Sequence, residues 1–289
     1  MVRLKKALIC SDLDRTIIPN GYQKESALAR PVFRRLAEHS NISLAYVSGR
    51  DKKLILDAIE EFYLPMPDYA IGDVGTTFYR IINGNWQLSD DWSDEIGQDW
   101  KGLAGGKLSE FLEDMAEIRL QEPEKQKHYK VSFYTDQNVD HQRLIKNIRG
   151  ALAEKGVPAS IIWSVDEISA NGLLDIIPPR ANKLHAIQFL MQQEHFPEDR
   201  TVFAGDSGND MDVLTSGLQT ILVKNATEDI REDALKKLSE KNLTNRLYLP
   251  QGNLFGMNGN YAAGLMEGLV HFIPETGELI AKAVEKSDR

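Results

Sequence analysis

The chain has 289 residues, a length that suggests about two domains. Its 43 acidic residues outnumber its 34 basic residues, and the net charge of −9 argues against a general nucleic-acid-binding surface. The single cysteine, Cys10, excludes an intramolecular disulfide and a cysteine-rich zinc site, and its apolar surroundings favour a buried structural thiol. No apolar stretch approaches the roughly 20 residues that span a bilayer, and the apolar run near the start is too short for a secretory signal. We therefore expect a soluble, cytoplasmic, globular protein.

The first part of the chain alternates strands with helices. Strands are predicted at 6–13, 42–50 and 68–80, the last with a glycine-rich turn in it, and amphipathic helices at 25–40 and 51–64. This alternation is typical of a parallel sheet with helices on both faces.

Residues 82–179 lack this strict alternation, which predicts a separate α+β module. Pro178 and Pro179 mark its exit. The predicted elements of the module are helices 107–118 and 141–156 and strands 129–136, 158–166 and 172–178.

The strand–helix rhythm returns after the module. Helices are predicted at 182–194, 211–217, 228–241 and 260–273. A strand that enters a loop is predicted at 200–210, and another strand at 219–226. The fold class is therefore predicted as α/β, with a doubly wound, Rossmann-like parallel-sheet core and an inserted α+β domain. The core would comprise residues 1–81 and 180–289, and the inserted domain residues 82–179.

Two pairs of aspartates follow predicted strands. Asp12 and Asp14 in "ALICSDLDRT" are spaced to share a face of an extended segment. Like charges held so close oppose each other's ionisation unless a cation or a shared proton relieves them. Asp206 and Asp210 in "FAGDSGND" form the second pair. Either these acids are ordinary surface carboxylates beyond strand ends, or they form a metal site.

Two further features suggest an anion site. Ser48 and Gly49 in "AYVSGR" offer a hydroxyl and an unhindered backbone N–H at a strand-to-helix loop, although Ser-Gly is also common in plain turns. Lys183 opens a predicted helix, where the helix dipole disfavours a cation, so it is either a solvated surface residue or a cation placed for a ligand. Ligands of parallel sheets gather at the carboxyl ends of strands, and clustered carboxylates there favour Mg²⁺.

In this order, the segments "DLDRT", "VSGR", Lys183 and "GDSGND" resemble the four motifs of the haloacid dehalogenase superfamily of phosphohydrolases. The insertion lies where one branch of that superfamily carries a larger α/β cap, and the resemblance implies that residues 82–179 form such a cap and determine substrate specificity. Within this branch the chain is similar to sucrose-phosphate phosphatases, through segments such as "YKVSFYTD", "DIIPPRANKLHAIQFL" and "YAAGLMEGLVHF". It departs from them at Arg15, where Asn is usual, and at Ser48, where Thr is common.

The resemblance implies a magnesium-dependent phosphatase that hydrolyses a sugar phosphate through an aspartyl-phosphate intermediate. Its substrate would be sucrose 6-phosphate or a related disaccharide phosphate. Asp12 would be the nucleophile and Asp14 the general acid and base, while Ser48, Gly49 and Lys183 would bind the phosphoryl group. The implied ligands of magnesium are Asp12, the main-chain carbonyl of Asp14, and Asp206, with Asp210 in support.

Similarity to the same branch makes Lys130, Arg180 and Asn182 candidates for sugar binding, although each is equally well read as a surface or hinge residue. A mannosylfructose-phosphate phosphatase or another sugar-phosphate phosphatase is an alternative. A phosphosugar mutase on the same scaffold and a non-catalytic binding protein are further alternatives, and no protein partner is predicted.

Overall fold

The structure is a computed structural model that describes residues 5–165 and 171–287. The chain forms two compact units. The first comprises Met1–Leu88 and Lys183–Arg289, and the second comprises Ser89–Asn182. The predicted domain boundaries lie within seven residues of these limits, and the role of the second unit as a substrate-selecting cap stays a prediction.

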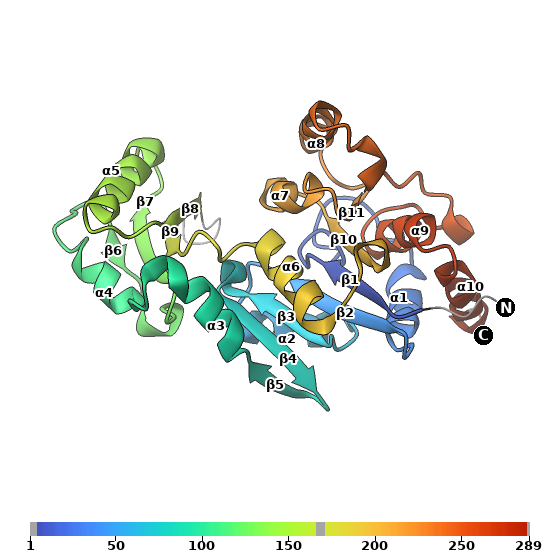
Figure 1. Cartoon of the computed structure of the whole chain (residues 1–289). Coiled ribbons are helices and arrows are strands. Elements are labelled where there is room, and N and C mark those ends of the chain that lie inside the picture. The colour runs from blue at the N-terminus through green and yellow to red at the C-terminus, as the bar shows by residue number, and fades with distance from the viewer. Residues whose placement is uncertain (1–4, 166–170, 288–289) are drawn as a thin grey trace. The chain divides into compact units, whose positions relative to one another are not determined.

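An eight-stranded sheet forms the centre of the first unit (Figure 1). Six neighbouring strands run parallel, and the last two continue the sheet in antiparallel fashion. The predicted parallel core sheet is therefore confirmed. In spatial order the strands are β12 (Leu247–Tyr248), β11 (Gln219–Leu222), β10 (Thr201–Gly205), β1 (Ala7–Ser11), β2 (Ile42–Val47), β3 (Tyr69–Gly72), β4 (Thr77–Ile82) and β5 (Asn85–Leu88).

Helices cover both faces of this sheet. Alternate residues of β1 point to opposite faces, and Ile9 joins an apolar cluster with Phe33 and Leu265 from the helices on one side. The thiol of Cys10 is buried, as predicted. The helices of the unit are α1 (Ala29–Ala37), α2 (Lys52–Glu61), α6 (Lys183–Glu194), α7 (Met211–Leu214), α8 (Glu228–Glu240), α9 (Ala262–Phe272) and α10 (Thr276–Ser287).

The second unit has its own sheet, which is entirely antiparallel and has the order β6-β7-β9-β8. Helix α5 buries Leu144, Ile148 and Leu152, which share one face at a spacing of four residues. The predicted α+β module is therefore confirmed as a fold. Its elements are β6 (Arg119–Leu120), β7 (Val131–Asp136), β8 (Ser160–Val165), β9 (Asn171–Ile177), α3 (Asp90–Gly97), α4 (Gly105–Glu110) and α5 (His141–Glu154).

Two predicted elements differ from the structure. The helix expected at 107–118 ends at Glu110, because the chain then folds into successive i to i−3 turns up to Ile118. The strand expected at 68–80, with a glycine-rich turn in it, is an antiparallel hairpin of two strands, and Asp73 and Val74 at its turn adopt left-handed backbone conformations that reverse the chain. Asp166, at the end of another predicted strand, lies outside the described residues.

Candidate functional site

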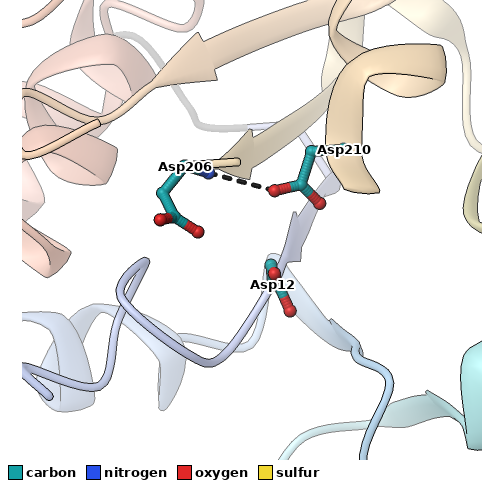
Figure 2. Close-up of side chains that lie close together, drawn as sticks. All are labelled: Asp12, Asp206 and Asp210. Carbon is teal, nitrogen blue, oxygen red and sulfur yellow. Dashed lines mark hydrogen bonds between the residues drawn. The ribbon is translucent and has the colours of Figure 1, made fainter. Parts of the chain in front are cut away.

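Three buried aspartates meet at the carboxyl end of the core sheet (Figure 2). Asp12 follows β1 and Asp206 follows β10, and these parallel neighbours bring the two residues together. Asp210 lies in the short turn that follows Asp206. One carboxylate oxygen from each of the three lies within 4.8 Å of the others. The predicted convergence of these acids is therefore seen in the structure.

Hydrogen bonds from the preceding backbone hold the side chain of Asp210 in place. Its Oδ2 accepts hydrogen bonds from the backbone N–H groups of Asp206 at 3.0 Å and Ser207 at 3.2 Å. A Cβ atom at Gly205 would lie 2.5 Å from the same oxygen, so only glycine leaves room for this carboxylate. Gly205, the first glycine of "AGDSGND", is thus required by packing within the site.

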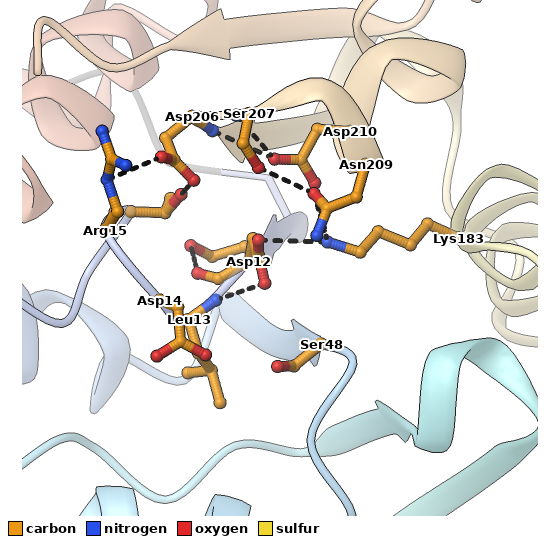
Figure 3. A network of polar contacts seen from close by, with 12 residues as sticks. Asp12, Leu13, Asp14, Arg15, Ser48, Lys183, Asp206, Ser207, Asn209 and Asp210 are labelled. Carbon is orange, nitrogen blue, oxygen red and sulfur yellow. Dashed lines mark hydrogen bonds and ion pairs between the residues drawn. The ribbon is translucent and has the colours of Figure 1, made fainter. Parts of the chain in front are cut away.

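Lys183 lies between two of the three acids (Figure 3). Its Nζ is 3.1 Å from Asp12 Oδ2 and 2.7 Å from Asp210 Oδ1, and the side chain is 9% exposed. Burial alone would lower the pKa of Lys183, but the two carboxylates outweigh it and raise that pKa above its usual value. Lys183 is therefore a fixed cation of the site and not a solvated surface residue.

The acids still repel one another despite this lysine. Burial, opposed by Lys183 and reinforced by the nearby Asp210, raises the pKa of Asp12 to about 7. Burial and the charge of Asp210 raise the pKa of Asp206 to about 6, although Arg15 and Lys183 lower it. Additional positive charge, beyond that of the protein's own cations, would therefore be needed to keep Asp12 and Asp206 fully ionised at neutral pH.

This arrangement fits a divalent cation. Asp206 Oδ2 is buried and has no hydrogen-bond partner among the described residues, although such oxygens are normally satisfied. The donor set consists of carboxylate oxygens, which Mg²⁺ prefers. Asp12, Asp206 and Asp210 are the side chains that would hold the ion.

The carboxylate of Asp14 lies outside this group of three and is held by other residues. Its two oxygens accept hydrogen bonds from Arg50 Nε at 2.8 Å and Arg50 Nη2 at 2.7 Å, and Oδ1 also accepts one from Asn20 Nδ2 at 2.8 Å. Burial would raise the pKa of Asp14, but the Arg50 contacts outweigh it and hold that pKa below its usual range. The side chain of Asp14 is thus bound by Arg50 and Asn20, and metal binding through the main-chain carbonyl of Asp14 stays a prediction.

A cavity of about 480 Å³ opens onto these groups. Ser48, which follows β2, is 2% exposed and lines it with Gly49. A Cβ atom at Gly49 would meet no heavy atom within 4 Å, so nothing in the protein itself fills this space. The residues that line the cavity are Asp12, Asp14, Arg15, Ser48, Gly49, Arg50, Leu54, Asp206, Ser207 and Asn209.

Comparison with known proteins identifies the family. A profile of the sucrose-6F-phosphate phosphohydrolase family matches residues 5–273. The chain belongs to this family. A protein from Nitrosococcus oceani, named only as a HAD-like hydrolase, is 53% identical over 283 residues, which make up 98% of this chain and 76% of that protein.

Two relatives that are less similar to this chain are named for a specific substrate. Sucrose-phosphatase 2 from Nicotiana tabacum is 29% identical over 78% of the chain, which spans only 52% of that protein. Mannosylfructose-phosphate phosphatase from Agrobacterium fabrum is 28% identical over 92% of the chain and 96% of that protein. The solved sucrose-phosphatase from Synechocystis, in complex with sucrose and phosphate, is 24% identical, has a TM-score of 0.66, and matches 93% of this chain and 98% of that one. The last likeness shows the shared fold.

The three residues of this chain that were predicted to bind sugar lie in the second unit. Lys130 precedes β7 and is 9% exposed. Arg180 contacts Asp99 through its backbone N–H at 2.8 Å and its Nε at 3.3 Å, and Asn182 donates a hydrogen bond to the carbonyl of Pro179. Arg180 and Asn182 therefore have roles within the second unit, and sugar binding by all three residues stays a prediction.

Sequence reasoning missed two members of the site, Arg50 and Asn20, and treated Arg15 only as a departure from relatives. Arg50 ends the quoted "VSGR" segment, so its place directly after a strand was a usable signal. Asn20 left no such signal in the sequence, because its contact with Asp14 depends on how the intervening loop folds.

Among the helices in the described ranges, none has both the length and the apolar character needed to cross a membrane.

Proposed function

We propose that the protein is a divalent-cation-dependent phosphatase of sugar phosphates, with sucrose 6-phosphate or a related disaccharide phosphate as its substrate. One observation carries this proposal most strongly: Lys183 contacts Asp12 and Asp210 at the carboxyl end of the sheet, with Asp206 beside them. Family membership over residues 5–273 supports the same reaction.

In the first step, an oxygen of Asp12 attacks the phosphorus and the bond from phosphorus to the sugar oxygen breaks. The sugar oxygen takes the electron pair of that bond together with a proton from Asp14. Ser48, the backbone N–H of Gly49 and Lys183 bind the phosphoryl oxygens. A bound Mg²⁺ would neutralise negative charge on those oxygens, and positioning with charge neutralisation is most of what phosphoryl transfer requires.

In the second step, a water molecule attacks the phosphorus of the aspartyl-phosphate. Asp14 takes the proton of that water, the bond from phosphorus to Asp12 breaks, and inorganic phosphate leaves. Arg50 and Asn20 favour the carboxylate form of Asp14, which accepts this proton. As the acid of the first step, Asp14 must enter the cycle protonated, so the negative charge of the bound phosphate ester has to raise its pKa against these contacts. These contacts support the assignment of Asp14 as the general base.

A second candidate substrate is mannosylfructose phosphate. The relative that carries this name is covered over 96% of its length, whereas the chain spans only 52% of the sucrose-phosphatase from Nicotiana tabacum. The full-length match makes this disaccharide phosphate a necessary member of any substrate panel. Both candidates require the same site and the same two steps.

Phosphate release tests the proposal. The purified protein is assayed with Mg²⁺ on sucrose 6-phosphate, mannosylfructose phosphate and several hexose monophosphates. Release from a disaccharide phosphate at a higher kcat/KM than from the hexose phosphates supports the assignment. Transfer of phosphate between sugar hydroxyls, without release of inorganic phosphate, would instead identify a mutase.

Variants identify the nucleophile. Asp12→Asn should lose at least about 10³-fold in kcat, because a carboxamide cannot form the phosphoaspartate, and should keep the far-UV circular dichroism spectrum of the wild type. Asp57→Asn, on the exposed face of α2, serves as the matched control and should retain wild-type activity. Substantial turnover by Asp12→Asn would remove Asp12 from its proposed role.

A further inference from the structure

Arg15 has an unusual backbone conformation next to the site. Its φ of 56° lies in the left-handed region, which residues other than glycine rarely adopt. Its backbone N–H donates to Asn20 Oδ1 at 2.8 Å, and its carbonyl accepts from Asn225 Nδ2 at 2.6 Å. Asn225 is 1% exposed and also accepts a hydrogen bond from the backbone N–H of Tyr261. A local contact from Asn20 and a long-range contact from Asn225 therefore hold this conformation, as expected where strain serves a function.

The side chain of Arg15 faces the acid that Lys183 does not contact (Figure 3). Its Nε lies 3.3 Å from Asp206 Oδ2, and neither atom has a hydrogen-bond partner among the described residues. The Arg15 side chain is 41% exposed and lines the cavity, whereas Asp206 is 3% exposed. One end of the guanidinium is thus buried against the carboxylate while the rest reaches the solvent.

The buried oxygen that Arg15 faces is the one best suited to bind a cation. Asp12 and Asp210 each give at least one oxygen to Lys183, and the remaining oxygens accept backbone N–H groups. An arginine keeps its charge at any pH at which proteins are studied, so Arg15 cannot yield this position by losing a proton. It must instead swing away from Asp206 or share the carboxylate with a bound ion.

We propose that Arg15 is a built-in competitor of the divalent cation for the carboxylate of Asp206. In the metal-free protein, Arg15 stabilises the ionised acid. When the cation is bound, the guanidinium gives up this contact and remains at the cavity wall. This inference rests on the metal site of the proposed function. It predicts an affinity for Mg²⁺ that is lower than the three carboxylates alone would give, and a metal-free protein that is more stable.

Isothermal titration of the metal-free protein with Mg²⁺ tests the proposal. Arg15→Gln should bind Mg²⁺ about tenfold more tightly, because the substitution removes a positive charge that contacts Asp206 and that water screens strongly, since the Arg15 side chain is 41% exposed. Arg15→Lys retains the charge and should stay within about threefold of the wild type. Arg50→Gln removes another arginine of the same cavity, one that contacts Asp14 instead, and its effect should be smaller than that of Arg15→Gln.

A thermal melt in EDTA gives a second readout. Metal-free Arg15→Gln should melt below the wild type, and its rise in melting temperature with saturating Mg²⁺ should be larger. Unchanged or weaker Mg²⁺ binding by Arg15→Gln, in a wild type that binds Mg²⁺ and releases phosphate, would overturn the role of Arg15 alone. Failure of the wild type to bind Mg²⁺ at all would overturn this inference together with the metal site of the proposed function.

Discussion

The metal-free Asp206→Asn variant should be more stable than the wild type at alkaline pH. The pKa of Asp206 rises from 3.8 to about 6 on folding, because the group is buried and close to Asp210. A difference of about two pKa units corresponds to about 3 kcal/mol, and little of this is lost to solvent screening because the side chain is 3% exposed. Asparagine resembles the protonated acid and avoids this destabilisation.

The sign of the pH dependence follows from the direction of the shift. A carboxyl group whose pKa is higher in the folded state binds more protons there than in the unfolded state. Its contribution to stability is fully present below about pH 4 and is lost as the pH rises through about 6. The advantage of Asp206→Asn should therefore be largest at pH 8 and small near pH 4.

Thermal denaturation in EDTA at pH 8 and pH 5 measures this effect. At pH 8 the variant should melt roughly 6 °C above the wild type, using about 2 °C per kcal/mol for a chain of this size. Asp57→Asn, whose side chain is 53% exposed on α2, is the control and should shift the melting temperature little. Saturating Mg²⁺ should reverse the order, because only the wild type keeps all three carboxylates. A variant that is less stable at pH 8, or an advantage independent of pH, would refute the reasoning.

Three further substitutions separate the parts of the site. Gly49→Ala should fold normally, since its Cβ meets no protein atom within 4 Å, but should raise both KM and the inhibition constant of inorganic phosphate by occupying the cavity; unchanged kinetics would contradict this. Gly205→Ala should lower the free energy of unfolding by about 1–3 kcal/mol and reduce Mg²⁺ binding, since its Cβ would lie 2.5 Å from the Asp210 carboxylate. Arg50→Gln should lower kcat at least about tenfold on a sugar phosphate but less on p-nitrophenyl phosphate, whose leaving group needs little help from the general acid Asp14. Equal losses on both substrates would show that Arg50 acts in some way other than positioning Asp14.

The convergence of the main acids was predictable because it follows from topology. Asp12 and Asp206 each follow an apolar strand, and parallel strands place their carboxyl ends at one edge of the sheet. Knowing that β1 lies between β10 and β2 adds only the identity of the neighbours. Lys183 was predictable only in part. A cation in the first turn of a helix is unfavourable, but a solvated surface residue stayed an equal alternative, and the resemblance to the third motif of the superfamily carried the assignment.

The ion pairs around these acids could not be predicted in the same way. The contact of Arg50 with Asp14 depends on two side-chain conformations and on a loop, none of which leaves a periodic pattern in the sequence. The position of Arg15 depends on Asn225, which lies 210 residues further along the chain. The helix expected at 107–118 was wrong because its apolar spacing continues after the backbone has changed to i to i−3 turns.

The two arginines also explain how one cavity can hold both acids and a phosphate ester. In the metal-free protein four aspartates face three cationic side chains, since Lys183 contacts Asp12 and Asp210, Arg15 contacts Asp206, and Arg50 contacts Asp14. With Lys183 alone, the site would carry three excess negative charges and would repel a phosphate dianion even with a divalent cation present. The arginines reduce this excess to one, so that a single Mg²⁺ leaves the site positive before the substrate enters. Cation binding and phosphate binding are therefore coupled through residues that touch the acids, and neither arginine needs to contact the phosphoryl group for this coupling to operate.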